Sequence, residues 1–220
     1  MQAKTSLDII QNTFQTDIAK HGKLQEFSKG EVIFSAEEMM KKFFFVFTGR
    51  IKVSQLNFLD GKEQILKILA KGDMYDTITL LDGKIHNNIL LALDKVQVLV
   101  LPIEVIRKWI TSNSRFNTYL FSYVSQQFRD IEELALDMSF YRTSERLIKL
   151  ISKNIDENDL NKLHLIHDLS HEDLASLIGT VRKVVNRHIQ NLKDDGLIEI
   201  NHKNIKIKDK QKLLDRLPIM

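Results

Sequence analysis

The sequence contains no cysteine, and only two prolines and eight glycines among its 220 residues. Without cysteine there can be no disulfide framework, no thiolate metal or iron–sulfur site and no cysteine nucleophile. No apolar run approaches the roughly 18 residues that span a bilayer, and the first residues lack the apolar core of a signal peptide. We therefore expect a cytoplasmic protein with no membrane partner.

Charge is nearly balanced along the chain but not evenly distributed. The formal net charge is +3, which is too weak to identify a partner. Residues 1–140 carry equal numbers of acidic and basic side chains, whereas residues 179–212 carry nine basic and four acidic ones. A locally basic segment favours a polyanionic partner, although taken alone it is more often a solvated charged face.

The first hundred residues have the pattern of antiparallel strands. Between residues 22 and 83 a glycine recurs every eight to nineteen residues, as in a compact barrel or sandwich. The β-branched and aromatic runs are EVIF (31–34), FFFVF (43–47), RIKVSQL (50–56), EQILKIL (63–69) and VQVLVL (96–101). Asp60-Gly61 predicts a hairpin between two of these runs, because both residues tolerate positive φ.

A helix is predicted from Ile103 to about Leu136, where glycine and proline are absent. Its apolar residues alternate in steps of three and four, which is typical of a coiled-coil seam. The predicted seam is Leu120, Val124, Gln127, Ile131, Leu134 and Met138. A second apolar face, with Phe116, Tyr119, Tyr123 and Phe128, would pack on the β region. We expect a homodimer through this helix, although so short a seam also occurs on helices docked on their own domain.

The basic segment predicts two short helices joined by a glycine turn. An amphipathic helix over 142–155 and a strand over 162–166 precede it. Ser170, followed by Asp173, has the pattern of a capping box, and Gly179 ends the first helix. Thr180 would cap a second helix over 181–194. This order is typical of a helix-turn-helix.

The second helix carries hydrogen-bond donors on one side. They are Arg182, Lys183, Asn186, Arg187 and Gln190, residue types that donate to guanine or adenine edges. A hairpin follows, and His202 and Lys203 at its tip could contact a phosphate backbone. Together with Thr180, these residues form the predicted DNA-binding surface.

The stretch LSHEDLASLIGTVRKVVNRHIQNLKDDGLIEINHKNIKI resembles the DNA-binding segment of the catabolite activator protein and fumarate–nitrate reduction regulator (CRP/FNR) superfamily. KGEVIF, TGRIKV and KGD resemble that family's β-roll. The resemblance implies an α+β fold: a β-roll over 1–103, a dimerisation helix over 104–139 and a winged helix-turn-helix over 140–220. It also implies a transcription regulator that binds palindromic double-stranded DNA as a homodimer and acts with RNA polymerase.

The possible effector pocket departs from the family pattern. Cyclic-AMP-binding members hold the ribose with a Gly-Glu pair and the phosphate with an Arg-Ser pair. Here the matching residues are Asp76, Thr77, His86, Asn87 and Asn88, and no arginine lies between Arg50 and Arg107. A buried phosphate without a cation is costly, so we expect an effector other than cyclic AMP, or none.

Several alternatives stay open. The protein could be a cyclic-nucleotide-responsive or a haem-responsive regulator, and His86 or His21 could formally serve as the haem ligand. The helix-turn-helix could also contact protein rather than DNA in a ligand-binding dimer. His164, His167 and His171 share no regular face, which does not favour a metal site. The sequence has no nucleophile motif or phosphate-binding glycine loop, so we expect neither an enzyme nor a cofactor.

Overall fold

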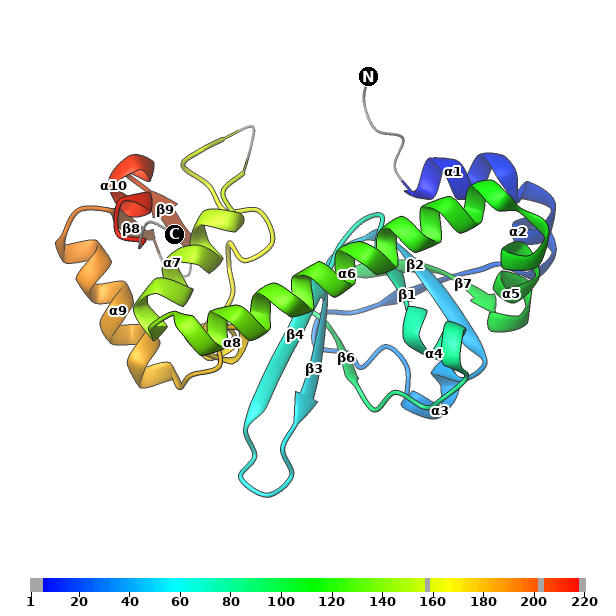
Figure 1. Cartoon of the computed structure of the whole chain (residues 1–220), viewed down its shortest axis with the longest axis horizontal. Helices are drawn as coiled ribbons and strands as arrows, with labels where there is room; N and C mark the ends of the chain where they lie inside the picture. Colours follow the sequence, from blue (N-terminus) through cyan, green and yellow to red (C-terminus); the bar gives the residue numbers. More distant parts are fainter. Residues whose placement is uncertain (1–5, 157–158, 202–203, 218–220) are drawn as a thin grey trace. The chain divides into compact units, whose positions relative to one another are not determined.

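The computed structural model describes residues 6–156, 159–201 and 204–217. It divides into two compact units, residues 1–129 and residues 130–220, and helix α6 (Ser114–Phe140) runs through the boundary (Figure 1). The first unit is rich in β-structure and the second is mainly helical. The predicted α+β fold class is confirmed, whereas the three-part division with a separate dimerisation helix stays a prediction.

Two antiparallel sheets form the centre of the first unit. Their strand orders are β1-β7-β2-β5 and β4-β3-β6. The strands are β1 (Lys23–Phe27), β2 (Lys42–Thr48), β3 (Ile51–Leu56), β4 (Glu63–Leu69), β5 (Met74–Tyr75), β6 (Ile89–Ala92) and β7 (Val96–Pro102). In β2, Phe43 and Phe45 join one core cluster while Phe44 and Val46 join another. Successive residues of a strand point to opposite faces, so this strand is covered on both sides.

The predicted strands are confirmed except for EVIF. In that run only Val32 pairs, through an isolated bridge to Leu91. The Asp60-Gly61 hairpin is confirmed, since β3 and β4 pair as far as Leu56 and Glu63, and Gly61 has a φ of +70°. The connection over 57–62 is longer than a two-residue turn, and a hydrogen bond from the Asn57 amide to the Lys62 carbonyl closes it.

Helices pack against both cores of the first unit. They are α1 (Ser6–Thr13), α2 (Gln15–His21), α3 (Ala36–Met39), α4 (Thr77–Asp82) and α5 (Ile103–Ser112). Met39 of α3 joins the core that contains Phe44, whereas the other four helices pack on the core that contains Phe43. Trp109 is central to that core: its ring stacks on Phe14 at a centroid distance of 3.9 Å and meets the edge of Phe116 at 5.5 Å. Its indole Nε1 donates to Asp17 Oδ2 at 2.7 Å. The core therefore joins α2, α5 and α6.

The predicted long helix is broken in two at Asn113. This residue has extended backbone angles, with φ −136° and ψ 100°. Its Oδ1 accepts a hydrogen bond from the Phe116 amide at 2.9 Å, so Asn113 caps the start of α6. The helix changes direction without glycine or proline because an asparagine side chain satisfies the new terminus.

In its described residues, the second unit begins with the end of α6 and continues with helices, a hairpin and a short last helix. The helices before the hairpin are α7 (Thr143–Lys153), α8 (His171–Leu177) and α9 (Arg182–Asp194). The hairpin consists of β8 (Ile198–Asn201) and β9 (Asn204–Ile207), and the last helix is α10 (Lys210–Leu214). The strand predicted over 162–166 is wrong. Within the described part of this unit, Leu163 forms only an isolated bridge to Ile155, so no ladder is available to extend it.

Candidate nucleic-acid interface

The first helix of the predicted helix-turn-helix begins where the sequence indicates. Ser170 Oγ accepts a hydrogen bond from the Asp173 amide at 3.0 Å, which caps α8. Leu174 and Ala175 are buried, and Gly179 follows with a φ of +65°. The Thr180 amide donates to the Ala175 carbonyl at 2.9 Å, which closes the turn between the helices. The cap and the glycine turn are both confirmed.

The second helix begins one residue later than predicted. Val181 takes the cap position with extended angles, and no side chain caps the helix there. Thr180 therefore does not cap α9, because it lies one residue too early and its amide is held in the turn. Val181 itself is 57% exposed rather than buried. The buried side of α9 consists of Val185, Ile189 and Leu192.

The opposite side of α9 is polar and exposed. We call Arg182, Lys183, Asn186, Arg187 and Gln190 the α9 stripe; all five are exposed. Gln190 Nε2 donates to Asp194 Oδ1 at 2.6 Å, and Asn186 Oδ1 lies 2.5 Å from His171 Nδ1 on α8. Burial and the charge of Arg187 lower the pKa of the neighbouring His188. The stripe thus owes its positive charge to Arg182, Lys183 and Arg187.

A two-stranded wing follows α9. Strands β8 and β9 pair from Ile198 with Ile207 to Asn201 with Asn204. His202 and Lys203, the predicted tip residues, lie outside the described residues. On the flank of the wing, Lys208 Nζ pairs with Glu199 at 2.5 Å.

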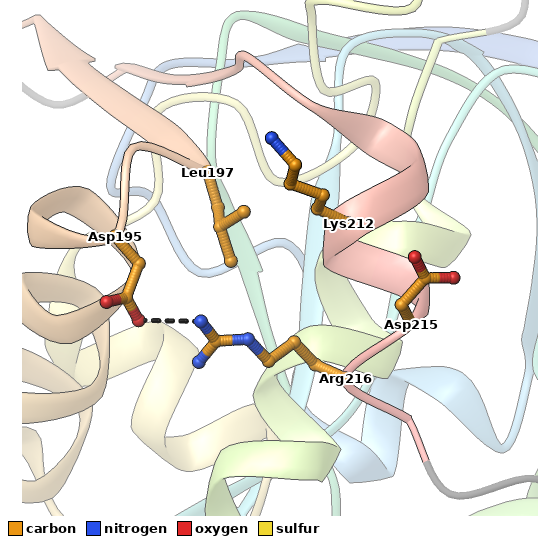
Figure 2. A pocket seen from close by; sticks show the side chains of 5 residues that line it. All are labelled: Asp195, Leu197, Lys212, Asp215 and Arg216. Carbon is orange, nitrogen blue, oxygen red and sulfur yellow. Dashed lines mark ion pairs between the residues drawn. The ribbon is translucent and has the colours of Figure 1, made fainter.

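A small pocket between α9, the wing and α10 was not predicted from the sequence (Figure 2). It is lined by Asp195, Leu197, Lys212, Asp215 and Arg216. Arg216 Nη2 pairs with Asp195 Oδ2 at 2.9 Å across it. Two acidic and two basic side chains balance the charge of the lining, which therefore favours no ion of either sign. Asp195 and Arg216 are 21 positions apart in the chain, and no local sequence pattern indicates that they meet.

Three of the five predicted effector residues form one network in the first unit. Asp76 caps α4, accepting from the Ile78 amide at 3.0 Å, and its Oδ2 also accepts from Thr79 Oγ1 at 2.8 Å. His86 Nδ1 lies 3.0 Å from the same Oδ2. Asn88 Nδ2 lies 3.1 Å from His86 Nε2. Asp76, His86 and Asn88 are thus held together by their own chain.

Two further residues of this region, Thr77 and Asn87, were predicted from the sequence, and a third, Tyr75, was not. Thr77 is buried at the start of α4, whereas the side chain of Asn87 is exposed. The missed residue is Tyr75, whose hydroxyl accepts from Asn88 Nδ2 at 2.8 Å. Burial, together with the charge of Asp76, raises the pKa of Tyr75. Lys67 lies over the Tyr75 ring at 5.6 Å, a contact between strands that the sequence alone does not indicate.

The network sets the ionisation of Asp76. Burial alone raises the pKa of a carboxyl group. Here the hydrogen bonds from His86 and Thr79 outweigh burial, so the pKa of Asp76 lies below its ordinary value. A lowered pKa means that the charged form is the one the folded state stabilises.

Asp76→Asn should reduce the free energy of unfolding at pH 7 by about 1–3 kcal/mol, because it keeps a capping oxygen but loses the charge facing His86. With a lowered folded-state pKa, this stabilisation is complete above the ordinary carboxyl pKa of about 4 and is lost as pH falls through the folded-state value. Urea unfolding should show a difference between the two proteins that is constant down to about pH 5 and narrows below about pH 4. A difference that persists unchanged at pH 3 would contradict this origin.

The structure corrects the predicted helix seam on α6. Leu120 is fully buried in the core of its own first unit, so it is unavailable to a partner helix. Gln127 Oε1 accepts from Lys67 Nζ on β4 at 2.5 Å and faces the same way. Val124 also packs partly against that core. The three-four spacing describes two adjacent faces of a helix equally well, and here the face containing Leu120 and Gln127 packs on the β-structure.

A neighbouring side of α6 is apolar and exposed. Phe121, Phe128 and Ile131, the α6 stripe, are 56%, 67% and 59% exposed. Their spacing of seven and three residues places them on one side of the helix. Phe128 was predicted to pack on the β region, and that prediction is wrong. Leu134 and Met138, the last predicted seam residues, are half-buried, and Met138 Sδ accepts from Arg146 at 2.7 Å.

Two domain families match the chain, one in each part. The cyclic nucleotide-binding domain matches residues 24–113, and the Crp-like helix-turn-helix domain matches residues 142–216. The chain belongs to the CRP/FNR family of transcriptional regulators. The resemblance inferred from the sequence is confirmed, and with it the assignment of the α8–α9 pair to a helix-turn-helix.

Relatives within the CRP/FNR family align over most of the chain. The CRP-like cAMP-activated global transcriptional regulator of Mycobacterium tuberculosis is 22% identical over 195 residues, which cover 87% of this chain and 86% of that protein. The global nitrogen regulator of Synechococcus elongatus is 20% identical over 190 residues, covering 84% of this chain and 85% of the relative.

Solved structures of the family share the fold. FixK2 from Bradyrhizobium japonicum has a TM-score of 0.78 and 18% identity, covering 90% of this chain and 98% of its own. A CooA structure from Carboxydothermus hydrogenoformans has a TM-score of 0.79 and 20% identity, covering 98% and 96%. At these identities the likeness shows the architecture alone.

In the ranges that the structure describes, no helix is long and apolar enough to cross a membrane. The same residues contain no group of three or more His, Asp or Glu side chains placed to hold a metal ion. His167 Nδ1 instead contacts the His164 carbonyl at 2.7 Å. For haem, the Nδ1 atom of His86 is already engaged with Asp76.

Proposed function

We propose that this CRP/FNR family member is a homodimeric regulator that binds a palindromic DNA site in a sequence-specific manner. The α9 stripe is the observation that carries the proposal. Five exposed donors lie on one side of a helix whose opposite side is buried in the second unit. In a dimer, two such helices would enter the major groove about one DNA turn apart, roughly 34 Å.

The rival function is a ligand-binding dimer whose helix-turn-helix contacts another protein. A gel-shift titration against salt separates the two. Phosphate contacts release counterions, so DNA affinity should fall steeply with salt, with a log–log slope of about −0.9 for each phosphate contacted. A chain that shows no DNA binding even at about 50 mM salt would favour the rival.

The chemistry of the α9 stripe suggests which bases are read. Arg182 and Arg187 can each donate two hydrogen bonds to guanine O6 and N7, which contributes roughly 1–3 kcal/mol of discrimination. In the best-known members of the family a glutamate lies directly after the first arginine, where it can accept from cytosine N4. Lys183 occupies that position here and can only donate, so it favours guanine or a phosphate.

Lys183→Glu should move the preferred half-site towards the familiar TGTGA type by changing one base pair, because a glutamate accepts from cytosine N4. Selecting bound DNA from a random pool measures the change. Arg182→Ala is the comparison variant and should weaken binding and relax preference, by roughly 1–3 kcal/mol. If Lys183→Glu changes only the salt slope and leaves base preference as it was, Lys183 is a phosphate contact instead.

The effector is proposed to be something other than cyclic AMP, or absent. Both carboxylate oxygens of Asp76 are engaged by the chain itself. Arg50, the nearest arginine before this region, pairs through two nitrogens with Asp94, each at 2.7 Å. A cyclic phosphate would therefore lack the arginine that compensates its burial in cyclic-AMP-binding members of the family. As a transcription regulator, the protein is proposed to act with RNA polymerase and without catalysis of its own.

A further inference from the structure

The two helices of the helix-turn-helix are joined by a side-chain contact at the exposed surface. His171 is the first residue of α8, and its Nδ1 lies 2.5 Å from Oδ1 of Asn186 on α9. A carboxamide oxygen can only accept, so His171 Nδ1 is the donor in this arrangement. Asn186 belongs to the α9 stripe and is exposed, so the rest of its amide is open to a ligand.

The contact determines which of the two polar atoms of the Asn186 amide faces His171. An asparagine amide can turn by 180° and exchange its oxygen and nitrogen at little cost in free solution. While His171 keeps its proton on Nδ1, the turn would place the Nδ2 donor of Asn186 against that N–H donor. As long as Nδ1 is protonated, the hydrogen bond therefore selects one of the two orientations, and it leaves one oxygen lone pair and both Nδ2 hydrogens of Asn186 available.

We propose that His171 is a specificity-determining positioning residue, which orients Asn186 so that it reads one base and not a second. This inference rests on the proposed function, in which the α9 stripe faces DNA. An oriented amide offers an acceptor and a donor side by side, the pattern that pairs with adenine N6 and N7. A free amide can also turn its donor towards guanine O6, so removing His171 relaxes the choice between the two purines.

The experiment selects bound DNA from a random pool with the wild type and His171→Ala. His171→Ala should reduce the preference for adenine over guanine at one base pair in each half-site, on the order of tenfold. Asn186→Ala should remove the preference there, and adding His171→Ala to it should change nothing further at that position. His171→Gln, which keeps a side-chain donor, should restore part of the wild-type preference. Thermal unfolding of each variant checks that the fold is retained.

The outcomes separate this inference from the function on which it rests. If His171→Ala lowers affinity equally for all sequences and reduces the salt slope, His171 is a phosphate contact and the inference is overturned. Unchanged base preference in a folded His171→Ala protein overturns it as well, while sequence-specific binding by the wild type still supports the proposed function. A wild-type protein that selects no DNA overturns the proposed function and the inference together.

Discussion

A glutamate in place of Ile131 should leave the protein monomeric and abolish its binding to a palindromic DNA site. Ile131 is 59% exposed in the α6 stripe, beside Phe128 at 67%. In the proposed dimer this stripe meets its copy on the partner helix, so the new carboxylate would be buried against apolar side chains. Burying an unpaired charge in this way costs about 3–5 kcal/mol. Dimer affinity should therefore fall by roughly 10²- to 10⁴-fold.

Sedimentation velocity at micromolar concentration without DNA measures this change directly. Leu136→Glu is the matched control, because Leu136 is also apolar and 51% exposed on α6. It lies five residues after Ile131, which places it about 140° around the helix from Ile131 and about 80° from Phe128. The control should remain a dimer. An Ile131→Glu protein that still sediments as a dimer would place the interface on another surface.

Trp109→Ala should destabilise the first unit by about 3–5 kcal/mol, the range for removing a large buried aromatic side chain. Trp109 is 1% exposed and stacks on Phe14 at 3.9 Å, so its removal opens a cavity between α2, α5 and α6. Asp17 would also lose the indole hydrogen bond of 2.7 Å. Because this core holds the first half of α6, the loss should weaken the dimer as well.

Scanning calorimetry and circular dichroism should measure the loss of stability. Tryptophan fluorescence is unsuitable, because Trp109 is the only tryptophan of the chain. Trp109→Phe serves as the control: it keeps an aromatic ring for Phe14 but loses the Nε1 donor, so it should cost less than half as much. Equal and small losses in both variants would mean that the surrounding helices close around the cavity.

Local chemistry explains why the helix-turn-helix could be predicted so closely. Ser170 caps α8 through a hydrogen bond to a residue three positions away, and Gly179 takes its positive φ without help from distant residues. The α9 stripe follows from the period of the helix. The start of α9 was misplaced by one residue because Thr180 and Val181 both precede a helical pattern, and the closing hydrogen bond to Ala175 decides between them.

Contacts between distant segments were harder to anticipate. The segment 162–166 has the composition of a strand, but it forms only an isolated bridge, between Leu163 and Ile155. The Asp76 network was located in part, because the resemblance to the family's effector pocket led to Asp76, His86 and Asn88. Tyr75 and Lys67 joined this region only through the pairing of strands, which residue types do not specify.

The sequence by itself determined the α+β fold class, the order of a β-rich part before a helix-turn-helix, and the residues of the α9 stripe, because caps, turns and helical periodicity act over a few residues. The tertiary structure alone decided which side of α6 is free. Leu120 and Phe128 are both apolar and both fit a three-four pattern, yet one is fully buried and the other is 67% exposed. This helix has more than one apolar face, but only one face can pack on the adjoining β-structure. The shape of that core and the hydrogen bond from Lys67 to Gln127 determine which face it is.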